Sequence, residues 1–303
     1  MHFMVMALSS CLIPLPLHPA GLTPPPVAGS TGGAVNVAQQ VLQHGGRAEA
    51  AEQPALVCED ERGRVRVVSW RLLQQRVASL ALALKDMGLY RGDCVAAYVP
   101  NGPEAVVAWL ACASIGVVWS ACGPDLPTPQ VLERFQHLAP RALIAVDGVW
   151  RDGQPHDRST VVTQLQLGLP SVAYLITVRT PFSAARVPGA TDFDALTDRE
   201  DARTRAFVPE GVTADHPLWV VFEASPAGAP QPVIQGHGEV LRQHSDIGDG
   251  VATRSPGDAG WCAQVCALLG GNTIALMDRP LRPNEANPVS GTNQDVPTQW
   301  PHS

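Results

Sequence analysis

Residues 94–122 read CVAAYVPNGPEAVVAWLACASIGVVWSAC, and this stretch decides the fold. Cys94 to Val99 is an unbroken apolar run, which is typical of a strand buried on both faces. Pro103 to Gly116 has helical character and begins with proline, which is favoured at the first helical position. Val117 to Ala121 is a second short apolar run. A strand, a helix and a second strand in this order predict a β–α–β unit with parallel strands.

The residues before this unit predict a strand followed by a helix. Arg64 to Val68 is a short β-like run, and Ser69 is a residue type that caps helices. Gly88 lies where a left-handed residue would end that helix. The apolar stripe of the expected helix consists of Leu73, Val77, Leu80, Leu84 and Met87.

The residues after the unit continue the alternation. Thr128 and Pro129 are expected to cap a helix that reaches Leu138, and the stretch from Asp192 to Asp201 is expected to be a loop, as is the segment around His156. Further strands are expected at Ala142–Val146, Tyr174–Val178, Leu218–Phe222 and Asn272–Met277, and helices at Gly236–His244 and Trp261–Leu269. The sequence therefore predicts an α/β fold with a mostly parallel sheet flanked by helices.

Composition excludes several classes of function. The net charge of −7 gives no electrostatic reason to bind nucleic acid or an anionic membrane surface. A membrane-spanning helix needs about 20 apolar residues, and no run approaches that length. The seven cysteines are an odd number at irregular spacing, which favours reduced, buried thiols in a cytoplasmic protein. Lys85 is the only lysine, and it lies in the expected early helix, where a solvated surface position is predicted.

The two ends of the chain differ from its middle. Residues 1–35 are rich in Pro, Gly, Ser and Thr and are expected to be a disordered leader. The apolar start resembles a signal peptide only weakly, because no basic residue precedes it and Pro14 and Pro16 interrupt it. Residues 282–303 are polar and aperiodic, and we expect a disordered tail there. Residues 36–281 would then form the folded part.

Several segments resemble the acetoacetyl-CoA synthetase branch of the adenylate-forming acyl-CoA synthetases. Tyr98–Val106 is similar to that superfamily's "YLPN…EAV" segment, and Ala113–Asp125 to the branch's "ASIGAIWSSCSPDF". Val131–Phe135 and Leu143–Gly148 resemble its "VLDRF…LIAVDG". Asp215–Val220 looks like the "DHPLW" strand that precedes the family's phosphate-binding loop. The resemblance covers about four fifths of the chain, in the right order.

The resemblance implies a reaction in two steps. Acetoacetate would attack the α-phosphate of ATP in the presence of Mg²⁺, and the thiol of CoA would then displace AMP. Catalysis of this kind consists mainly of positioning and of neutralising charge on phosphate oxygens. The resemblance stops at Asp278, so we expect an amino-terminal part of the family's chain, without its later adenine-binding motif, hinge and mobile domain.

The resemblance also shows a changed phosphate-binding loop. The family's loop reads approximately "YSSGTTGLPK", in which backbone N–H groups, hydroxyl groups and a lysine surround the phosphates. Residues 222–231 read FEASPAGAPQ here, so the hydroxyl positions are mostly lost and the lysine position is Gln231. Ser225, Gly228, Pro230 and Gln231 are the remnant of the loop. We therefore expect no retained cofactor, although the family uses ATP, Mg²⁺ and CoA.

Two further residues match family positions near the site. His237, in the sequence Gly236-His237-Gly238, matches a position near the loop, and a hydrogen-bonded turn histidine is the competing interpretation. Trp261 matches a residue that lines the approach of the acyl group and CoA, but the two threonines that precede it in the family are replaced. A packing role is the alternative for Trp261. No metal site is expected, and Cys262 and Cys266 are interpreted as small core residues.

The favoured hypothesis is a degenerate homologue of acetoacetate–CoA ligase that does not catalyse the reaction. One alternative is a binding module that keeps affinity for acyl groups or nucleotides. Another is half of a ligase that acts with a second chain, which the missing loop lysine disfavours. The resemblance places Leu218–Phe222 and Asn272–Met277 in one sheet that continues into later strands of the family, so we expect an open sheet edge and self-association through it.

Overall fold

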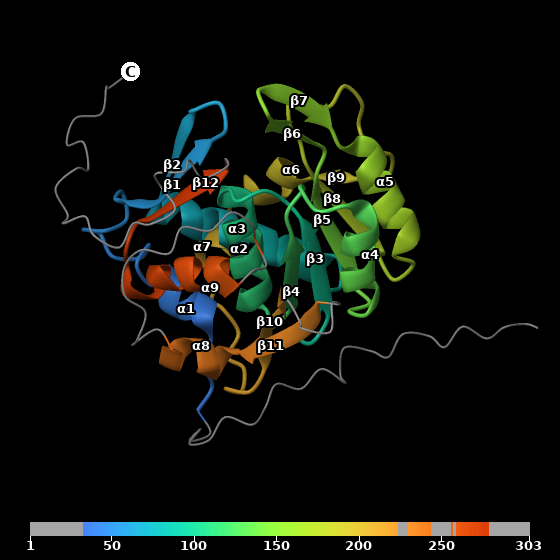
Figure 1. Ribbon diagram of the computed structural model, residues 1–303. Helices are drawn as coiled ribbons and strands as arrows, with labels where there is room; N and C mark the ends of the chain where they lie inside the picture. Colours follow the sequence, from blue (N-terminus) through green and yellow to red (C-terminus); the bar gives the residue numbers. More distant parts are fainter. Residues whose placement is uncertain (1–32, 224–229, 244–255, 257–258, 279–303) are drawn as a thin grey trace, which may run out of the picture.

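The computed structural model describes residues 33–223, 230–243, 256 and 259–278 (Figure 1). The leader expected at residues 1–35 falls almost entirely outside these residues, and the tail expected at residues 282–303 does so completely. Val35 pairs with Val212, its N–H donating to the carbonyl oxygen at 2.8 Å. Asn36 caps the first helix, α1 (Val37–Leu42), by accepting a hydrogen bond from the N–H of Ala38.

A seven-stranded, mostly parallel sheet forms the centre of the molecule, so the predicted α/β fold is confirmed. Its strand order is β11-β10-β4-β3-β5-β8-β9, and only β11 runs antiparallel to its neighbour. The strands are β3 (Cys94–Tyr98), β4 (Val118–Cys122), β5 (Ala142–Val146), β8 (Tyr174–Val178), β9 (Thr191–Asp192), β10 (Pro217–Glu223) and β11 (Gln231–Gly236).

Helices cover both faces of this sheet, which is why its central strands are continuous apolar runs. On one face, alternate residues such as Val95, Ala97 and Trp119 join a core with α1, α2 (Trp70–Asp86), α3 (Pro103–Ser114) and α9 (Ala259–Cys266). On the other face, Ala96 and Leu143 pack against α4 (Thr128–Gln136) and α5 (Ser159–Gly168). Figure 1 shows α4 and α5 together on one flank of the sheet and α1 beside α9 on the other.

The helix ends follow the expected residues in α2 and α3 and differ in α4. Ser69 caps α2, its Oγ accepting from the N–H of Leu72 at 3.3 Å, and Gly88 follows the helix with a left-handed φ of 81°. Pro103 begins α3. The prediction that Thr128 caps α4 was wrong: Thr128 is already helical, and Pro127 occupies the cap position without a side-chain hydrogen bond.

A second sheet has three strands in the order β12-β1-β2. They are β1 (Pro54–Asp60), β2 (Val65–Ser69) and β12 (Ile274–Asp278), with β12 parallel to β1 and β2 antiparallel to it. The expectation that Leu218–Phe222 and Asn272–Met277 share one sheet was wrong, because β10 belongs to the large sheet and β12 to this one. Hydrogen bonding to β1, which is distant in sequence, decides the place of β12.

Two segments expected as loops contain regular structure. His156 lies in a hairpin of β6 (Gly148–Arg151) and β7 (Gln154–Asp157). The acidic stretch from Asp192 to Asp201 holds α6 (Phe193–Thr197), and it lies between β9 and α7 (Ala202–Arg205). The side chains of Asp192 and Asp201 cap these two short helices. The remaining described elements are α8 (His237–Gln243) and a 3₁₀ turn at Ala267–Gly270. Within the described ranges no helix is long and apolar enough to cross a membrane.

Candidate functional site at the carboxyl edge of the sheet

The carboxyl ends of the parallel strands β10, β4, β3, β5 and β8 meet at one edge of the large sheet. From β3 the chain passes to β4 on one side and then to β5 on the other side, so the strand order reverses at β3. Open α/β sheets bind ligands in the crevice outside the carboxyl ends of their strands, next to such a reversal. This edge is therefore the candidate site.

The segment interpreted above as the remnant of a phosphate-binding loop connects β10 to β11 at this edge. Glu223 ends β10 and Gln231 begins β11, and the two residues are register partners. Pro230 directly precedes β11, whereas Ser225 and Gly228 lie outside the described residues. The glutamate is thus paired across the hairpin with the glutamine that replaces the expected lysine. The chain's only lysine, Lys85, is half-exposed on α2, where it forms an ion pair with Glu210.

His237 lies at the opposite side of the sheet from the loop, where β10 begins. Because β11 runs antiparallel to β10, Gly236 pairs with Pro217 at the amino end of β10, and His237 follows directly. Seven residues of strand at about 3.3 Å each place His237 roughly 20 Å from the loop end of the hairpin. The structure does not bring His237 together with Pro230 and Gln231, the described residues of that remnant.

The surroundings of His237 are those of a core histidine. Its ring is fully buried, its Nδ1 accepts the N–H of Val37 at 3.1 Å, and the ring of His216 lies 5.9 Å away. Its Nε2 is buried without a partner among the described residues. Burial is the main reason that its pKa falls to about 3, and His216 and Arg91 lower the pKa further. The imidazole is therefore neutral at physiological pH, with its proton on Nε2.

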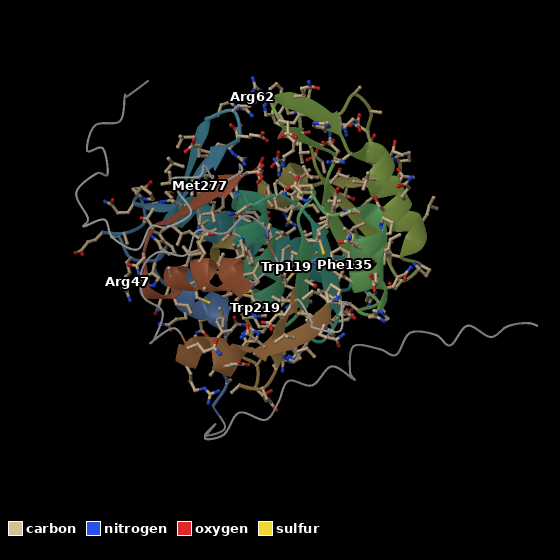
Figure 2. The ribbon with its side chains drawn as sticks, viewed as in Figure 1. Arg47, Arg62, Trp119, Phe135, Trp219 and Met277 are labelled. Carbon is tan, nitrogen blue, oxygen red and sulfur yellow. The ribbon has the colours of Figure 1, made fainter. Side chains whose placement is uncertain are left out.

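Trp261, in α9, is also fully buried, on the face of the sheet that α1, α2 and α3 cover. Its ring centroid lies 5.9 Å from Trp109 and 6.5 Å from Trp219. Its Nε1 donates to Oδ1 of Asn101 at 3.1 Å, which ties α9 to the segment that follows β3. Figure 2 shows Trp219 near the centre of the molecule, beside Trp119 of the neighbouring strand. These contacts favour the packing role for Trp261.

Arg151, at the carboxyl edge, was not among the residues that the sequence predicted for the site. Arg151, at the end of β6, contacts the carboxylates of Asp278 at 2.7 Å, Asp125 at 2.8 Å and Glu61 at 3.5 Å. Burial raises the pKa of Asp278, and Arg151 opposes that rise. The four residues come from β6, the end of β12, the segment after β4 and the β1–β2 turn. Arg151 therefore fastens the small sheet beside the carboxyl edge of the large one.

Within the described ranges, the other reactive side chains do not gather into a site. The six described cysteines are buried free thiols, and burial raises the pKa of Cys58, Cys94 and Cys266 to about 12. Such thiols are poor nucleophiles because the thiolate is the reactive form. Among the residues that the structure describes, no group of three His, Cys, Asp or Glu side chains could hold a metal ion.

Comparisons with known proteins agree with the fold. The chain belongs to the AMP-binding enzyme family, whose sequence profile matches residues 43–296 and so continues past Asp278, where the resemblance was expected to stop. Relatives within that family include acetoacetyl-CoA synthetases. The protein from Macaca fascicularis is 31% identical over 222 residues, or 70% of this chain and 32% of the relative. The Rhizobium meliloti (strain 1021) protein is 34% identical over 58% of this chain and 27% of its own length.

A solved structure shows the same relationship. Acetoacetyl-CoA synthetase from Streptomyces lividans superimposes with a TM-score of 0.73 at 37% identity, over 81% of this chain and 38% of that protein. The chain thus spans 27–40% of the length of the acetoacetyl-CoA synthetases that it matches.

Proposed function

We propose that this chain is a non-catalytic member of the acetoacetyl-CoA synthetase branch. The family reaction would convert ATP, acetoacetate and CoA to acetoacetyl-CoA, AMP and pyrophosphate. The observation that supports the proposal is the connection from β10 to β11, where Glu223 and Gln231 stand across the hairpin from each other. A loop that binds a polyanion needs positive charge and hydrogen-bond donors there, and this loop offers an acid and an amide.

The sequence between these two residues supports the same proposal. Pro226 has no N–H to donate and fixes φ, while Ala224 and Ala227 carry no hydroxyl group. Losing one well-placed donor typically costs roughly 2.7–4 kcal/mol of transition-state stabilisation. Several such losses together with the negative charge of Glu223 outweigh any single compensating contact. Adenylate formation should therefore be abolished.

A binding module without turnover is the second candidate, and the preserved carboxyl edge favours it. The hydrogen bond from Trp261 to Asn101 and the contacts of Arg151 order the segments that follow β3 and β4. Binding can survive the loss of transition-state contacts, because ground-state affinity and rate depend on different interactions.

Cytoplasmic location, without a nucleic-acid partner, is also part of the proposal. The net charge of −7 and the free thiols support it.

Acetoacetate-dependent exchange of labelled pyrophosphate into ATP tests the catalytic part of the proposal. We expect no exchange above that of heat-inactivated protein, and acetoacetate-dependent exchange above it would refute the proposal. Calorimetric titration with ATP, and separately with acetoacetyl-CoA, tests the second candidate. Saturable heat without exchange would support a binding module, whereas no heat with either ligand would eliminate it.

A further inference from the structure

Two hairpins from distant parts of the chain contact each other beside the carboxyl edge. Glu61, in the turn between β1 and β2, accepts a hydrogen bond at Oε1 from the N–H of Asp152 at 2.7 Å. The guanidinium of Arg62 lies over the ring of Trp150, 4.8 Å from its centroid, and Nη1 of Arg151 lies 3.5 Å from Oε2 of Glu61. Figure 1 shows both hairpins at the top of the view, and Figure 2 labels Arg62 there. We call these three contacts the hairpin clasp.

The β1–β2 side of the clasp is held in shape by its own residues. Asp60 accepts at Oδ1 from the N–H of Arg62 at 3.0 Å and from the N–H of Arg64 at 2.9 Å. Its Oδ2 accepts from Nε of Arg64 at 2.7 Å. Asp60 also ends β1, which has β2 on one side and β12 on the other. The β1–β2 turn is therefore a fixed support that presents Glu61 and Arg62 to the second hairpin.

The β6–β7 side has less support of its own. β6 and β7 form a separate two-stranded sheet, and no other described strand pairs with either of them. Asp152 and Gly153 make the turn, with left-handed φ angles of 52° and 74°, as a two-residue hairpin turn requires. A two-stranded hairpin alone is only marginally stable in water. Trp150 packs on Phe182, with ring centroids 5.6 Å apart, but the turn itself depends on the clasp.

The clasp is connected to the ends of the strands in the large sheet. β6 begins two residues after β5 ends, so the β6–β7 hairpin starts from the carboxyl edge. Arg151 also pairs with Asp125, which lies three residues after Cys122, the last residue of β4. Cys122 is only 1% exposed, although it lies at the edge where the strands end. With the clasp formed, the end of β4 is therefore closed to solvent.

We propose that the hairpin clasp opens reversibly and controls the access of small molecules to the carboxyl edge of the sheet. The β6–β7 hairpin is the part that moves, because Arg62 and Asp152 are exposed and polar contacts at a surface are weak. Segments with few buried apolar contacts also open at the lowest free energy. The proposal concerns access and rests on neither turnover nor a retained ligand, so it holds or fails independently of the proposed function.

Alkylation of the natural thiols by iodoacetamide, followed for each cysteine by peptide mass spectrometry, tests the clasp. Cys94 and Cys122 lie at opposite ends of adjacent strands in one core cluster, and both are free and 1% exposed. Glu61→Ala should raise the labelling rate of Cys122 relative to that of Cys94 at least about tenfold, since opening no longer breaks a hydrogen bond to a charged group. Glu49→Ala, at an exposed position, should keep this ratio within about twofold of that in the unchanged chain. An unchanged ratio in Glu61→Ala, including equal acceleration of both thiols, would overturn the proposal.

Hydrogen exchange in the unchanged chain tests the same opening without a substitution. The amide of Asp152 donates to Glu61, whereas the amide of Val95 lies in β3, which has a strand on each side. Opening of the hairpin alone exposes little surface, so exchange of the Asp152 amide should be slowed in water and nearly independent of low concentrations of urea. Exchange of the Val95 amide should accelerate with urea. The same steep dependence for both amides would show that the hairpin opens only when the whole chain unfolds, and an unprotected Asp152 amide would show that the clasp does not form. Either result would refute the proposal.

Discussion

The guanidinium of Arg151 donates a hydrogen bond to Oδ1 of Asp278 at 2.7 Å and so joins the end of β6 to the end of β12. Both side chains are mostly buried, with 14% and 20% of their surface exposed. Removing one partner of such a pair leaves the other charge buried and uncompensated. This contact is therefore central to the attachment of the small sheet.

Replacing Arg151 by Met should lower the free energy of unfolding by about 3–5 kcal/mol, because three carboxylates then lose their shared cation. Asp125→Asn should cost under about 1 kcal/mol, since 63% of that side chain is exposed. Urea unfolding followed by far-ultraviolet circular dichroism measures both. Equal losses in the two variants would mean that Arg151 acts as an ordinary surface cation.

The stability of the chain should fall with acidification because of His237. Its folded-state pKa, about 3, lies below the ordinary value of 6.5, so the unfolded state binds more protons between these values. The contribution of the neutral ring is complete above pH 6.5 and is lost as pH falls towards 3, at up to ~1.4 kcal/mol per pH unit. His237→Asn keeps an acceptor for Val37 and does not titrate.

Unfolding free energies at pH 6.5 and pH 4.5 provide the measurement for this prediction. The unchanged chain should lose about 2–3 kcal/mol more over this interval than His237→Asn does. His137→Asn, at an exposed position that follows α4, should retain the full dependence. A His237→Asn variant with the same pH profile as the unchanged chain would rule out this histidine as the source.

Substitution of Trp261 should separate packing from ligand contact. Trp261→Phe loses the hydrogen bond to Asn101 and part of the ring volume, and we expect a loss of about 1–3 kcal/mol in stability. Trp150→Phe, near the protein surface, should cost less. Thermal unfolding measures both, and near-ultraviolet circular dichroism should show the loss of coupling to Trp109. A fully stable Trp261→Phe variant would favour the ligand-contact interpretation.

Restoring the loop lysine alone should not restore activity. Gln231→Lys returns one positive charge, but Glu223, Pro226 and the missing hydroxyl groups remain. We expect no acetoacetate-dependent pyrophosphate exchange by this variant, measured with the unchanged chain in parallel. Exchange by Gln231→Lys but not by the unchanged chain would show that the lysine is the only missing part.

Self-association is expected through the small sheet rather than through β10. Val65 and Val67, on its outer strand β2, have 46% and 56% of their surface exposed. Exposed apolar edge strands template pairing between chains. Size-exclusion chromatography over a range of concentrations should show association, and Val67→Lys should reduce it. A monomer at every concentration would contradict this prediction.

The sequence predicted the central β–α–β unit closely, because the residues that determine its strands and helix ends act over short distances along the chain. Buried parallel strands must be continuously apolar, and Ser69, Gly88 and Pro103 act on the backbone within a few residues of themselves. The carboxyl edge could be anticipated for the same reason, since the loop remnant directly follows a strand.

Features that depend on distant contacts could not be predicted. His237 is six residues from Gln231 in sequence, but β11 carries it to the opposite edge of the sheet. The pairing of β12 with β1 has no local signature either. The boundaries expected at residues 36 and 281 stay predictions.

The parallel pairing of β1 with β12 also affects how the chain folds while it is being synthesised. The hydroxyl of Thr273 donates to the carbonyl of Pro54, 219 positions earlier. At a translation rate of about 5–20 residues per second, the nascent β1–β2 hairpin waits roughly ten to forty seconds for its third strand. During that interval one side of β1 has no strand partner from its own chain. Completion of the small sheet should therefore be a late folding event, and cells short of chaperones should accumulate the protein in inclusion bodies.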